Sequence, residues 1–286
     1  MEFIRSLLFV PAVRPRFIEK APESGADAVC LDLEDSVPPA EKANGRDVLR
    51  EIIPTLPRTG YKLFVRVNGL DTGLVETDLD AIVTPHLDGI SLPKCNNPET
   101  LRQADAYLTY LERTRGLEPG HVKILPWIET AEALIKVADI LQASGRLIGA
   151  SIGGEDFAND MGVMRTRENT EILFARYQVA TACAYAKILA IDSPVMDFRN
   201  QELLERDASF ARSIGFRAKY CIHPDQVATV NRIFSPREEE INFARKVVAA
   251  YEEGEKQGHG AVSMDGEVVD WPVYTRALAI LKSAQT

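Results

Sequence analysis

The sequence predicts an α/β protein, built as a (β/α)8 TIM barrel with a C-terminal helical extension. Short apolar runs alternate with longer segments in which apolar residues recur every three or four positions. Strands that alternate with helices favour a parallel sheet with crossover helices, and eight repeats within about 225 residues favour closure into a barrel. A chain of 286 residues is long enough for one large domain of this kind.

The elements of the barrel can be placed in order along the chain. The apolar runs that we expect to be strands are Ser6–Pro11, Ala28–Leu33, Leu63–Val67, Gly89–Leu92, Val122–Ile128, Leu147–Ile152, Ala190–Val195 and Ala218–Ile222. Helical spacing between them is clearest over Thr100–Arg115 and Ala131–Leu141. The competing architecture is an open doubly wound sheet, which favours a glycine-rich turn after the first strand. Here "LLFVPAVRPRF" offers prolines and arginines instead.

The pattern changes after Pro236. Arg237–Glu255 has the spacing of a charged amphipathic helix, and a last helix is expected from Trp271 to about Ser283. Between them, Met264–Glu267 contains Asp-Gly, which supplies the positive φ that a hairpin turn requires. This tail has too little apolar surface to fold alone. We therefore predict a catalytic barrel over residues 1–235 and an extension over 236–286 that belongs to the same functional unit.

The composition narrows the classes of partner. The chain has 33 basic and 42 acidic residues, a net charge of −9 and no run of Lys or Arg, which argues against nucleic acid or an anionic membrane as the main partner. The negative net charge does not exclude a small anionic ligand. The four cysteines lie far apart, as expected for reduced thiols. The first apolar run ends at Pro11, short of a signal-peptide core or a membrane span, so we expect a cytoplasmic protein.

Polar residues gather where the predicted strands end, which is where barrel enzymes place their chemistry. The strand ends read "DLED" at 32–35, "RVN" at 66–68, "PK" at 93–94, "IET" at 128–130, "GGED" at 153–156 and "HPD" at 223–225. Acids that converge from different strands repel each other unless a cation or protons intervene. Carboxylates without a Cys/His cluster of zinc spacing suit Mg2+ or Mn2+.

The best placed metal ligands are Glu129 and one of Glu155 and Asp156. The alternative for Glu129 is a cap on the helix that begins near Thr130. For Glu155 the alternative is a first-turn glutamate that faces the helix dipole, which we consider the better reading. Asp160, one turn further along, is expected to be structural or to face solvent.

Three other strand-end residues have a chemical and a structural interpretation. Arg66 suits a substrate carboxylate because of its planar fork, or else forms a buried ion pair with Glu34 or Asp35. Lys94 is either a Schiff-base lysine or, as we favour, a structural or substrate-steering charge. His223 is a packed imidazole or a catalytic one.

Taken together, these motifs resemble the citrate lyase β-subunit-like family (HpcH/HpaI aldolase/citrate lyase), which includes malyl-CoA and citramalyl-CoA lyases. The likeness is carried by "RSLLFVPAVRPRF" at 5–17, "GADAVCLDLEDSV" at 25–37, "VRVNG" at 65–69, "LPK" at 92–94, "IET" at 128–130, "GGEDFANDMG" at 153–162, "KYCIHPDQV" at 219–227 and "GEVVDWPVYTRA" at 266–277. The motifs span nearly the whole chain. The resemblance implies the same barrel fold.

The resemblance also implies roles for single residues. By motif, Glu129 and Asp156 hold Mg2+, with Mn2+ as a possible substitute, and Arg66 grips the carboxylate of an α-keto acid. Glu34 and Asp35 correspond to acids that contact metal-bound water. CoA enters as part of the substrate.

Two further features follow from the resemblance. A lid acid, which in the family often reaches the site of a neighbouring subunit, corresponds to Asp270, although the sequence pattern alone favours an N-cap before Pro272. We therefore expect a homo-oligomer, a trimer or a multiple of three. Where relatives often have glycine the chain has Ala12, in a loop whose Arg14 and Arg16 are expected near the CoA phosphates.

The implied reaction is Mg2+-dependent cleavage of a 3-hydroxy-3-carboxy acyl-CoA. Citramalyl-CoA would give acetyl-CoA and pyruvate, and malyl-CoA would give acetyl-CoA and glyoxylate; the sequence leaves this choice open, with a slight preference for citramalyl-CoA. Asp270 would exchange a proton with the acetyl-CoA enolate. The alternatives are hydrolysis of the thioester, as in thioesterase or malate-synthase-like relatives, a metal-free aldolase that uses Lys94, and a non-catalytic acyl-CoA-binding subunit.

Overall fold

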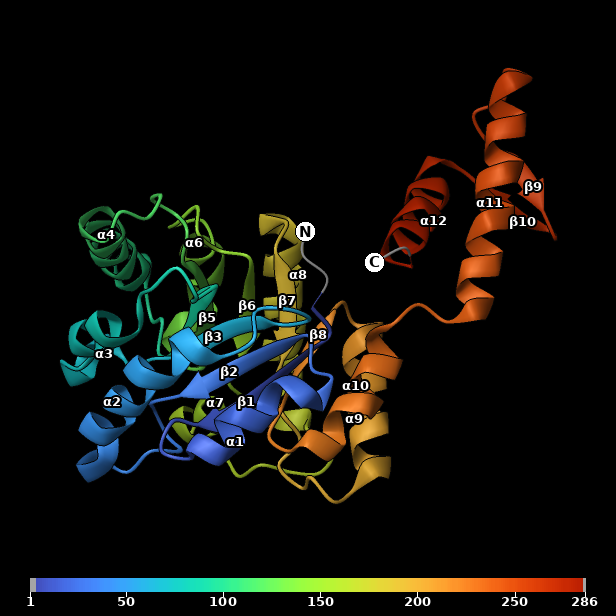
Figure 1. Ribbon diagram of the computed structural model, residues 1–286. Helices are drawn as coiled ribbons and strands as arrows, with labels where there is room; N and C mark the ends of the chain where they lie inside the picture. The colour runs from blue at the N-terminus through green and yellow to red at the C-terminus, as the bar shows by residue number, and fades with distance from the viewer. Residues whose placement is uncertain (1–3, 285–286) are drawn as a thin grey trace. The chain divides into compact units, whose positions relative to one another are not determined.

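Eight parallel strands close into a barrel in the computed structural model, which describes residues 4–284 (Figure 1). The strands are β1 Ser6–Pro11, β2 Ala28–Asp32, β3 Lys62–Arg66, β4 Gly89–Leu92, β5 Lys123–Ile128, β6 Gly149–Ile152, β7 Leu189–Asp192 and β8 Ala218–Cys221. Each pairs with the next, and β1 closes the ring by pairing with β8. The predicted (β/α)8 barrel is confirmed, and the open sheet is excluded.

Helices surround the barrel (Figure 1). They are α1 Pro15–Lys20, α2 Lys42–Ile52, α3 Val75–Ile82, α4 Pro98–Thr114, α5 Ala131–Ile135, α6 Val137–Ile140, α7 Gly154–Asp160, α8 Leu173–Ala186, α9 Gln201–Ser213 and α10 Val227–Phe234. The single helix predicted over 131–141 is wrong in one respect, because Lys136 leaves the helical region and divides it into α5 and α6. β7 ends earlier than predicted, before Pro194, which has no N–H to donate to a strand ladder.

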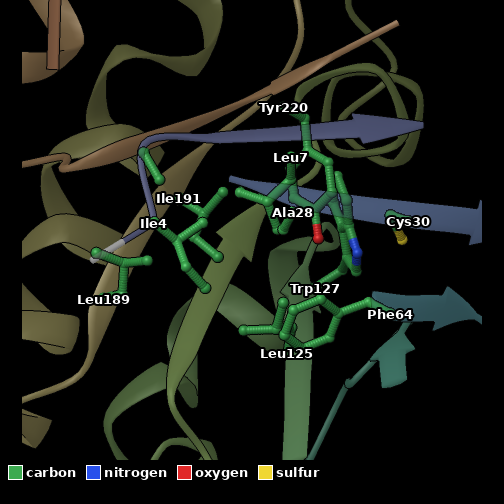
Figure 2. Close-up of a cluster of buried hydrophobic side chains, with 11 residues drawn as sticks. Ile4, Leu7, Ala28, Cys30, Phe64, Leu125, Trp127, Leu189, Ile191 and Tyr220 are labelled. Carbon is green, nitrogen blue, oxygen red and sulfur yellow. The ribbon is translucent and has the colours of Figure 1, made fainter. Parts of the chain in front are cut away.

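The barrel interior is filled by apolar side chains, which come from every second residue along the strands. Figure 2 shows this cluster, in which Phe64 and Trp127 lie close to Leu125. Gly89 makes room for it, since a Cβ there would lie 2.6 Å from the Phe64 ring. Strand alternation thus places apolar residues here and polar ones at the strand ends.

Three aromatic rings form part of this core and of the layer beneath Arg66. The Tyr220 ring stacks on Phe9 with 4.5 Å between centroids, and Trp127 lies 4.7 Å from Tyr220. Trp127 Nε1 donates to Ser91 Oγ at 2.6 Å, so the polar edge of the indole is satisfied inside the barrel. These rings form the floor of the barrel mouth.

A buried ion network connects β7 and β8 to the helices outside them. We call Arg176, Asp192, Asp207 and Lys219 the β7–β8 cluster. Lys219 Nζ lies 2.6 Å from Asp207, and Arg176 contacts Asp192 at 2.7 Å and Asp207 at 2.9 Å. Two cations and two carboxylates are therefore paired out of contact with water.

Residues from Arg232 onward form a second compact unit. It contains α11 Glu238–Lys256, the antiparallel pair β9 Val262–Met264 and β10 Glu267–Val269, and α12 Trp271–Ser283. Its own core includes Val247, Tyr251 and Ala277. Asp265 and Gly266 both have positive φ, 53° and 85°, which confirms the predicted hairpin turn.

Within residues 4–284, no helix combines the length and apolar character needed to span a bilayer.

Candidate active site

The end of β2 is organised by Asp32, a residue that sequence reasoning did not single out. Its carboxylate accepts the backbone N–H groups of Glu34 at 2.9 Å and Ser36 at 3.1 Å, which fixes the loop after the strand. Asp32 lies beside Arg66 in the ladder between β2 and β3. The sequence did contain a signal for Asp32, because strand alternation predicts that Asp32 and Arg66 both face the barrel interior at the same level.

Arg66 is held by acids on two sides. Its Nε and Nη2 each donate to Asp32 at 2.7 Å, and Nη1 lies 2.9 Å from Glu34 and 3.5 Å from Asp35. The guanidinium also stacks over the Phe9 ring, 4.6 Å from its centroid. The ion pair expected with Glu34 or Asp35 is present, but the bidentate partner is Asp32. Arg66 is therefore a rigid cation with a defined orientation.

Glu129 ends β5 and is almost completely buried, with 3% of its surface exposed. One carboxylate oxygen, Oε1, accepts the Lys94 N–H at 2.6 Å. A Cβ added to Gly153 would lie 2.5 Å from the Glu129 Cβ and closer still to Oε2, so only glycine fits there. Thr130, not Glu129, caps α5 by accepting the Ala133 N–H. The capping alternative for Glu129 is therefore wrong.

The three acids of "GGEDFAND" have different surroundings. Glu155 is half exposed and pairs with Arg165 at 2.9 Å. Asp160 accepts the Ala131 N–H at 2.7 Å, so it supports the start of α5. Asp156, in the first turn of α7, is the member that interacts electrostatically with Glu129. The structure thus separates one acid at the barrel mouth from two with structural partners.

The acids at the mouth share too little positive charge. We call Asp32, Glu34, Arg66, Glu129 and Asp156 the mouth cluster. Burial raises the pKa of Glu129 to about 8, and Asp156 and Glu34 add to the rise. Burial likewise raises the pKa of Glu34 to about 7, although Arg66 opposes it. The pKa of Asp156 is also raised, by burial and then by Asp35. Such crowding favours a bound proton or a cation.

The comparisons with known proteins identify the family. A sequence model of the HpcH/HpaI aldolase/citrate lyase family matches residues 5–224. The chain belongs to this family.

Individual relatives match over nearly the whole length of the chain. The chain is 35% identical to a citrate lyase subunit beta from Leuconostoc mesenteroides subsp. cremoris, covering 98% of this chain and 93% of the relative. It is 34% identical to an L-malyl-CoA/beta-methylmalyl-CoA lyase from Cereibacter sphaeroides, with coverage of 98% and 94%. CitE from Mycobacterium tuberculosis, solved with magnesium, acetoacetate and coenzyme A, is 28% identical, with a TM-score of 0.78 over 99% of this chain and 98% of that chain.

The mouth cluster fits the divalent cation expected for this family. Across residues 4–284, no group of three or more His, Cys, Asp or Glu side chains is arranged to hold a metal ion. Mg2+ does not require such a group, because it is usually held by one or two carboxylates and completes its shell with water and substrate oxygens. Glu129 and Asp156 supply two carboxylates whose mutual repulsion a cation would relieve. The residues present therefore suit a hard divalent ion.

Lys94 lies at the mouth with its amine held in the charged form. Although burial acts to lower it, the pKa of Lys94 is raised by Asp71, Glu34 and other nearby acids. A Schiff-base lysine needs the opposite, a neutral amine with a lowered pKa. The structure therefore argues against an imine-forming Lys94.

His223 is a packed imidazole. Its Nδ1 accepts the Asp225 N–H at 3.2 Å, and its ring stacks on Phe198 with 4.6 Å between centroids. Both contacts are structural and agree with the packed alternative.

The loop after β1 contains the residues predicted near CoA. Arg14 and Arg16 are exposed at the start of α1, whereas Ala12 is fully buried. Ala12 donates its N–H to the Asp32 carbonyl oxygen at 2.9 Å, so the alanine continues the barrel ladder. The predicted CoA contacts of the two arginines stay predictions.

Asp270 caps α12 in the second unit. Its side chain accepts the Val273 N–H at 3.2 Å, which is the N-cap that the sequence pattern favours. A cap uses one carboxylate oxygen and leaves the other available. Its role as a lid acid stays a prediction.

Proposed function

We propose that this chain is a Mg2+-dependent carbon–carbon lyase that cleaves a 3-hydroxy-3-carboxy acyl-CoA into acetyl-CoA and an α-keto acid. The observation that carries the proposal is the mouth cluster, where Glu129 and Asp156 interact electrostatically beside an oriented Arg66. The magnesium, acetoacetate and coenzyme A named with the Mycobacterium tuberculosis relative fit a site of this composition.

Glu129 and Asp156 are the residues that would hold Mg2+, or Mn2+ in its place. A bound Mg2+ supplies Lewis-acid polarisation of the substrate hydroxyl and carboxylate oxygens. Glu129 contributes a fixed carboxylate, because Lys94 holds one of its oxygens by a main-chain hydrogen bond. Asp156 contributes the second carboxylate from the first turn of α7.

Arg66 and Glu34 are proposed to orient the keto-acid portion and its water. Asp32 fixes the Nε and Nη2 side of Arg66, so the guanidinium keeps its direction when a substrate carboxylate binds. Glu34 has a pKa of about 7, which lets it hold or release a proton near neutral pH. Asp35 stands beside it as a further acceptor.

Asp270 is proposed as the acid that gives a proton to the acetyl-CoA enolate carbon after the carbon–carbon bond breaks. In the condensing direction its carboxylate removes that proton. A residue on a mobile lid suits this step, since closure excludes the water that would otherwise protonate the enolate. A homo-oligomer, a trimer or a multiple of three, would let this lid act on a neighbouring subunit.

Citramalyl-CoA and malyl-CoA are the proposed substrates, with a slight preference for the first. Their keto-acid products, pyruvate and glyoxylate, differ by one methyl group, which is worth about 1–3 kcal/mol in an apolar pocket. The CoA phosphates are proposed to lie near Arg14 and Arg16, both exposed after β1.

The test is an assay of the purified chain with citramalyl-CoA, malyl-CoA and citryl-CoA, with Mg2+ and with EDTA. We expect Mg2+-dependent release of acetyl-CoA and the matching keto acid, followed by mass spectrometry. Activity that survives EDTA, with borohydride trapping of pyruvate on Lys94, would establish the aldolase instead. Release of free CoA without acetyl-CoA would indicate a thioesterase, and binding without turnover an acyl-CoA-binding subunit.

A further inference from the structure

Lys94 follows β4 in a backbone conformation that is unusual for a residue with a side chain. Its φ is 51°, in the left-handed region that favours glycine. Non-glycine residues persist there only when their surroundings hold them, and they concentrate at functional sites. A physical role should therefore account for this turn.

The turn directs the Lys94 N–H at a buried acid. The N–H donates to Glu129 Oε1 at 2.6 Å, and the next loop residues are tied to the same strand end, since Thr130 Oγ1 donates to Asn96 Oδ1 at 2.8 Å. On its other side the Glu129 carboxylate lies against Gly153, where a side chain would clash with Oε2. Glu129 is thus held between a donor and a position that must stay empty.

We propose that Lys94 is a positioning residue for Glu129: its left-handed turn holds the main-chain N–H on Oε1 and so orients the carboxylate for a divalent cation. This inference rests on the proposed function, because it assumes that Glu129 is a metal ligand. Because Asn96 is tied to Thr130 just downstream, an extended or helical φ at Lys94 requires a shift of the segment that carries this N–H away from Oε1. Partners of this kind orient metal ligands and affect affinity as the ligands do.

The side chain has a separate effect. It runs along the loop after β3, with Cδ 3.8 Å from where a Cβ on Gly69 would lie. Its ammonium interacts with Asp71, Glu34 and Glu129 at the mouth. Because this positive charge repels a metal ion, removing it should not weaken cation binding. The main-chain and side-chain effects therefore have opposite signs and can be separated.

The experiment compares Lys94→Gly with Lys94→Val, using Mg2+ alone as the probe in isothermal titration calorimetry. Both variants lack the ammonium, but glycine adopts the left-handed turn and valine resists it. We expect Lys94→Gly to bind Mg2+ at least as tightly as the unaltered protein. Lys94→Val should bind it about tenfold more weakly than Lys94→Gly. If Lys94→Val does not fold, Lys94→Ala replaces it. Lys94→Ala should bind Mg2+ about threefold more weakly than Lys94→Gly, a smaller difference in the same direction.

Lys187 offers a matched control. It also has a left-handed conformation, with φ of 59°, at the exposed end of α8. Lys187→Gly and Lys187→Val make the same backbone change there, and they should bind Mg2+ equally. A Lys94→Val protein that binds Mg2+ as well as Lys94→Gly and only melts at a lower temperature would overturn the positioning role. That result differs from failure of the proposed function, in which the unaltered protein binds no Mg2+ and EDTA does not affect turnover.

Discussion

The two buried charge clusters of the barrel differ in how their charges balance. In the β7–β8 cluster two cations face two carboxylates, and although burial acts to raise it, the pKa of Asp207 is lowered by Lys219 and Arg176. In the mouth cluster four carboxylates share Arg66 and the nearby Lys94 ammonium, and the pKa values of Glu34 and Glu129 are still raised, to about 7 and about 8. One cluster is complete as it stands. The other has fewer cations than carboxylates.

This difference separates a structural cluster from a functional one. Buried charges that are fully paired and hydrogen-bonded hold a fold together, and nothing further needs to bind. Acids kept close without compensation cost stability, and such an arrangement is typical of sites that bind or transfer charge. The imbalance supports the proposal of a cation at the mouth more directly than any single residue type does.

The largest expected effect comes from removing a charge from the mouth cluster. Glu129→Gln keeps the size of the side chain but removes a proposed ligand, so Mg2+-dependent turnover should fall by about 1000-fold, equivalent to about 4 kcal/mol. The free energy of unfolding in urea without Mg2+ should not fall, because a crowded carboxylate has been neutralised. Near-normal turnover would show that Glu129 is not a metal ligand, and a marked loss of stability would show that the mouth cluster is structural like the β7–β8 cluster.

Removing a charge from the β7–β8 cluster should have the reverse pattern. Lys219→Met leaves Asp192 and Asp207 buried without one of their partners, which should cost about 3 kcal/mol of unfolding free energy. Urea titration followed by circular dichroism measures this loss. Mg2+ affinity of the folded protein should stay within a factor of about two. A variant as stable as the unaltered protein would show that this network is not structural.

Asp270 belongs to neither cluster, so its substitution tests whether proton transfer is separate from metal binding. Asp270→Asn should keep the cap on α12, because asparagine also accepts the Val273 N–H. Turnover should fall by about 100-fold, near 2.7 kcal/mol, with Mg2+ affinity unchanged. Steady-state kinetics and calorimetry provide the two measurements. An unaltered rate would leave Asp270 with only its role as a cap.

The two clusters should respond to pH in opposite directions. Glu129 has a raised folded pKa, so metal-free stability should decline by about 4 kcal/mol as pH rises from the unfolded value towards 8. Asp207 has a depressed pKa, so its contribution is present above the unfolded value and is lost as the solution is acidified. Urea titrations between pH 5 and 8, repeated on Glu129→Gln as the control, measure the first effect. Equal slopes for both proteins would contradict it.

Much of the architecture could be predicted because it depends on repeated local signals. Alternation and helical spacing located all eight strands, and the Asp-Gly pair located the hairpin. The limits of β6 and β7 were less accurate, because a strand ends where its hydrogen bonds end rather than where its apolar run does. The apolar spacing around Lys136 does not predict that the helix divides there into α5 and α6.

The candidate site was predictable in its residues but not in their arrangement. The motifs placed Arg66, Glu129 and Asp156 at strand ends, and these positions lie at the barrel mouth. Asp32 was missed because its importance depends on its neighbour in the ladder, which lies 34 residues away in sequence. The left-handed turn at Lys94 could not be predicted either, since a lysine carries no local signal for positive φ.

The space left by Gly153 gives a way to silence the enzyme without changing any charge. Its φ of −96° is open to every amino acid, so glycine is needed there for its size alone. An added methyl group would occupy the volume that the Glu129 carboxylate now fills. Gly153→Ala should therefore give a folded protein in which a single methyl group displaces the Glu129 carboxylate and turnover is lost.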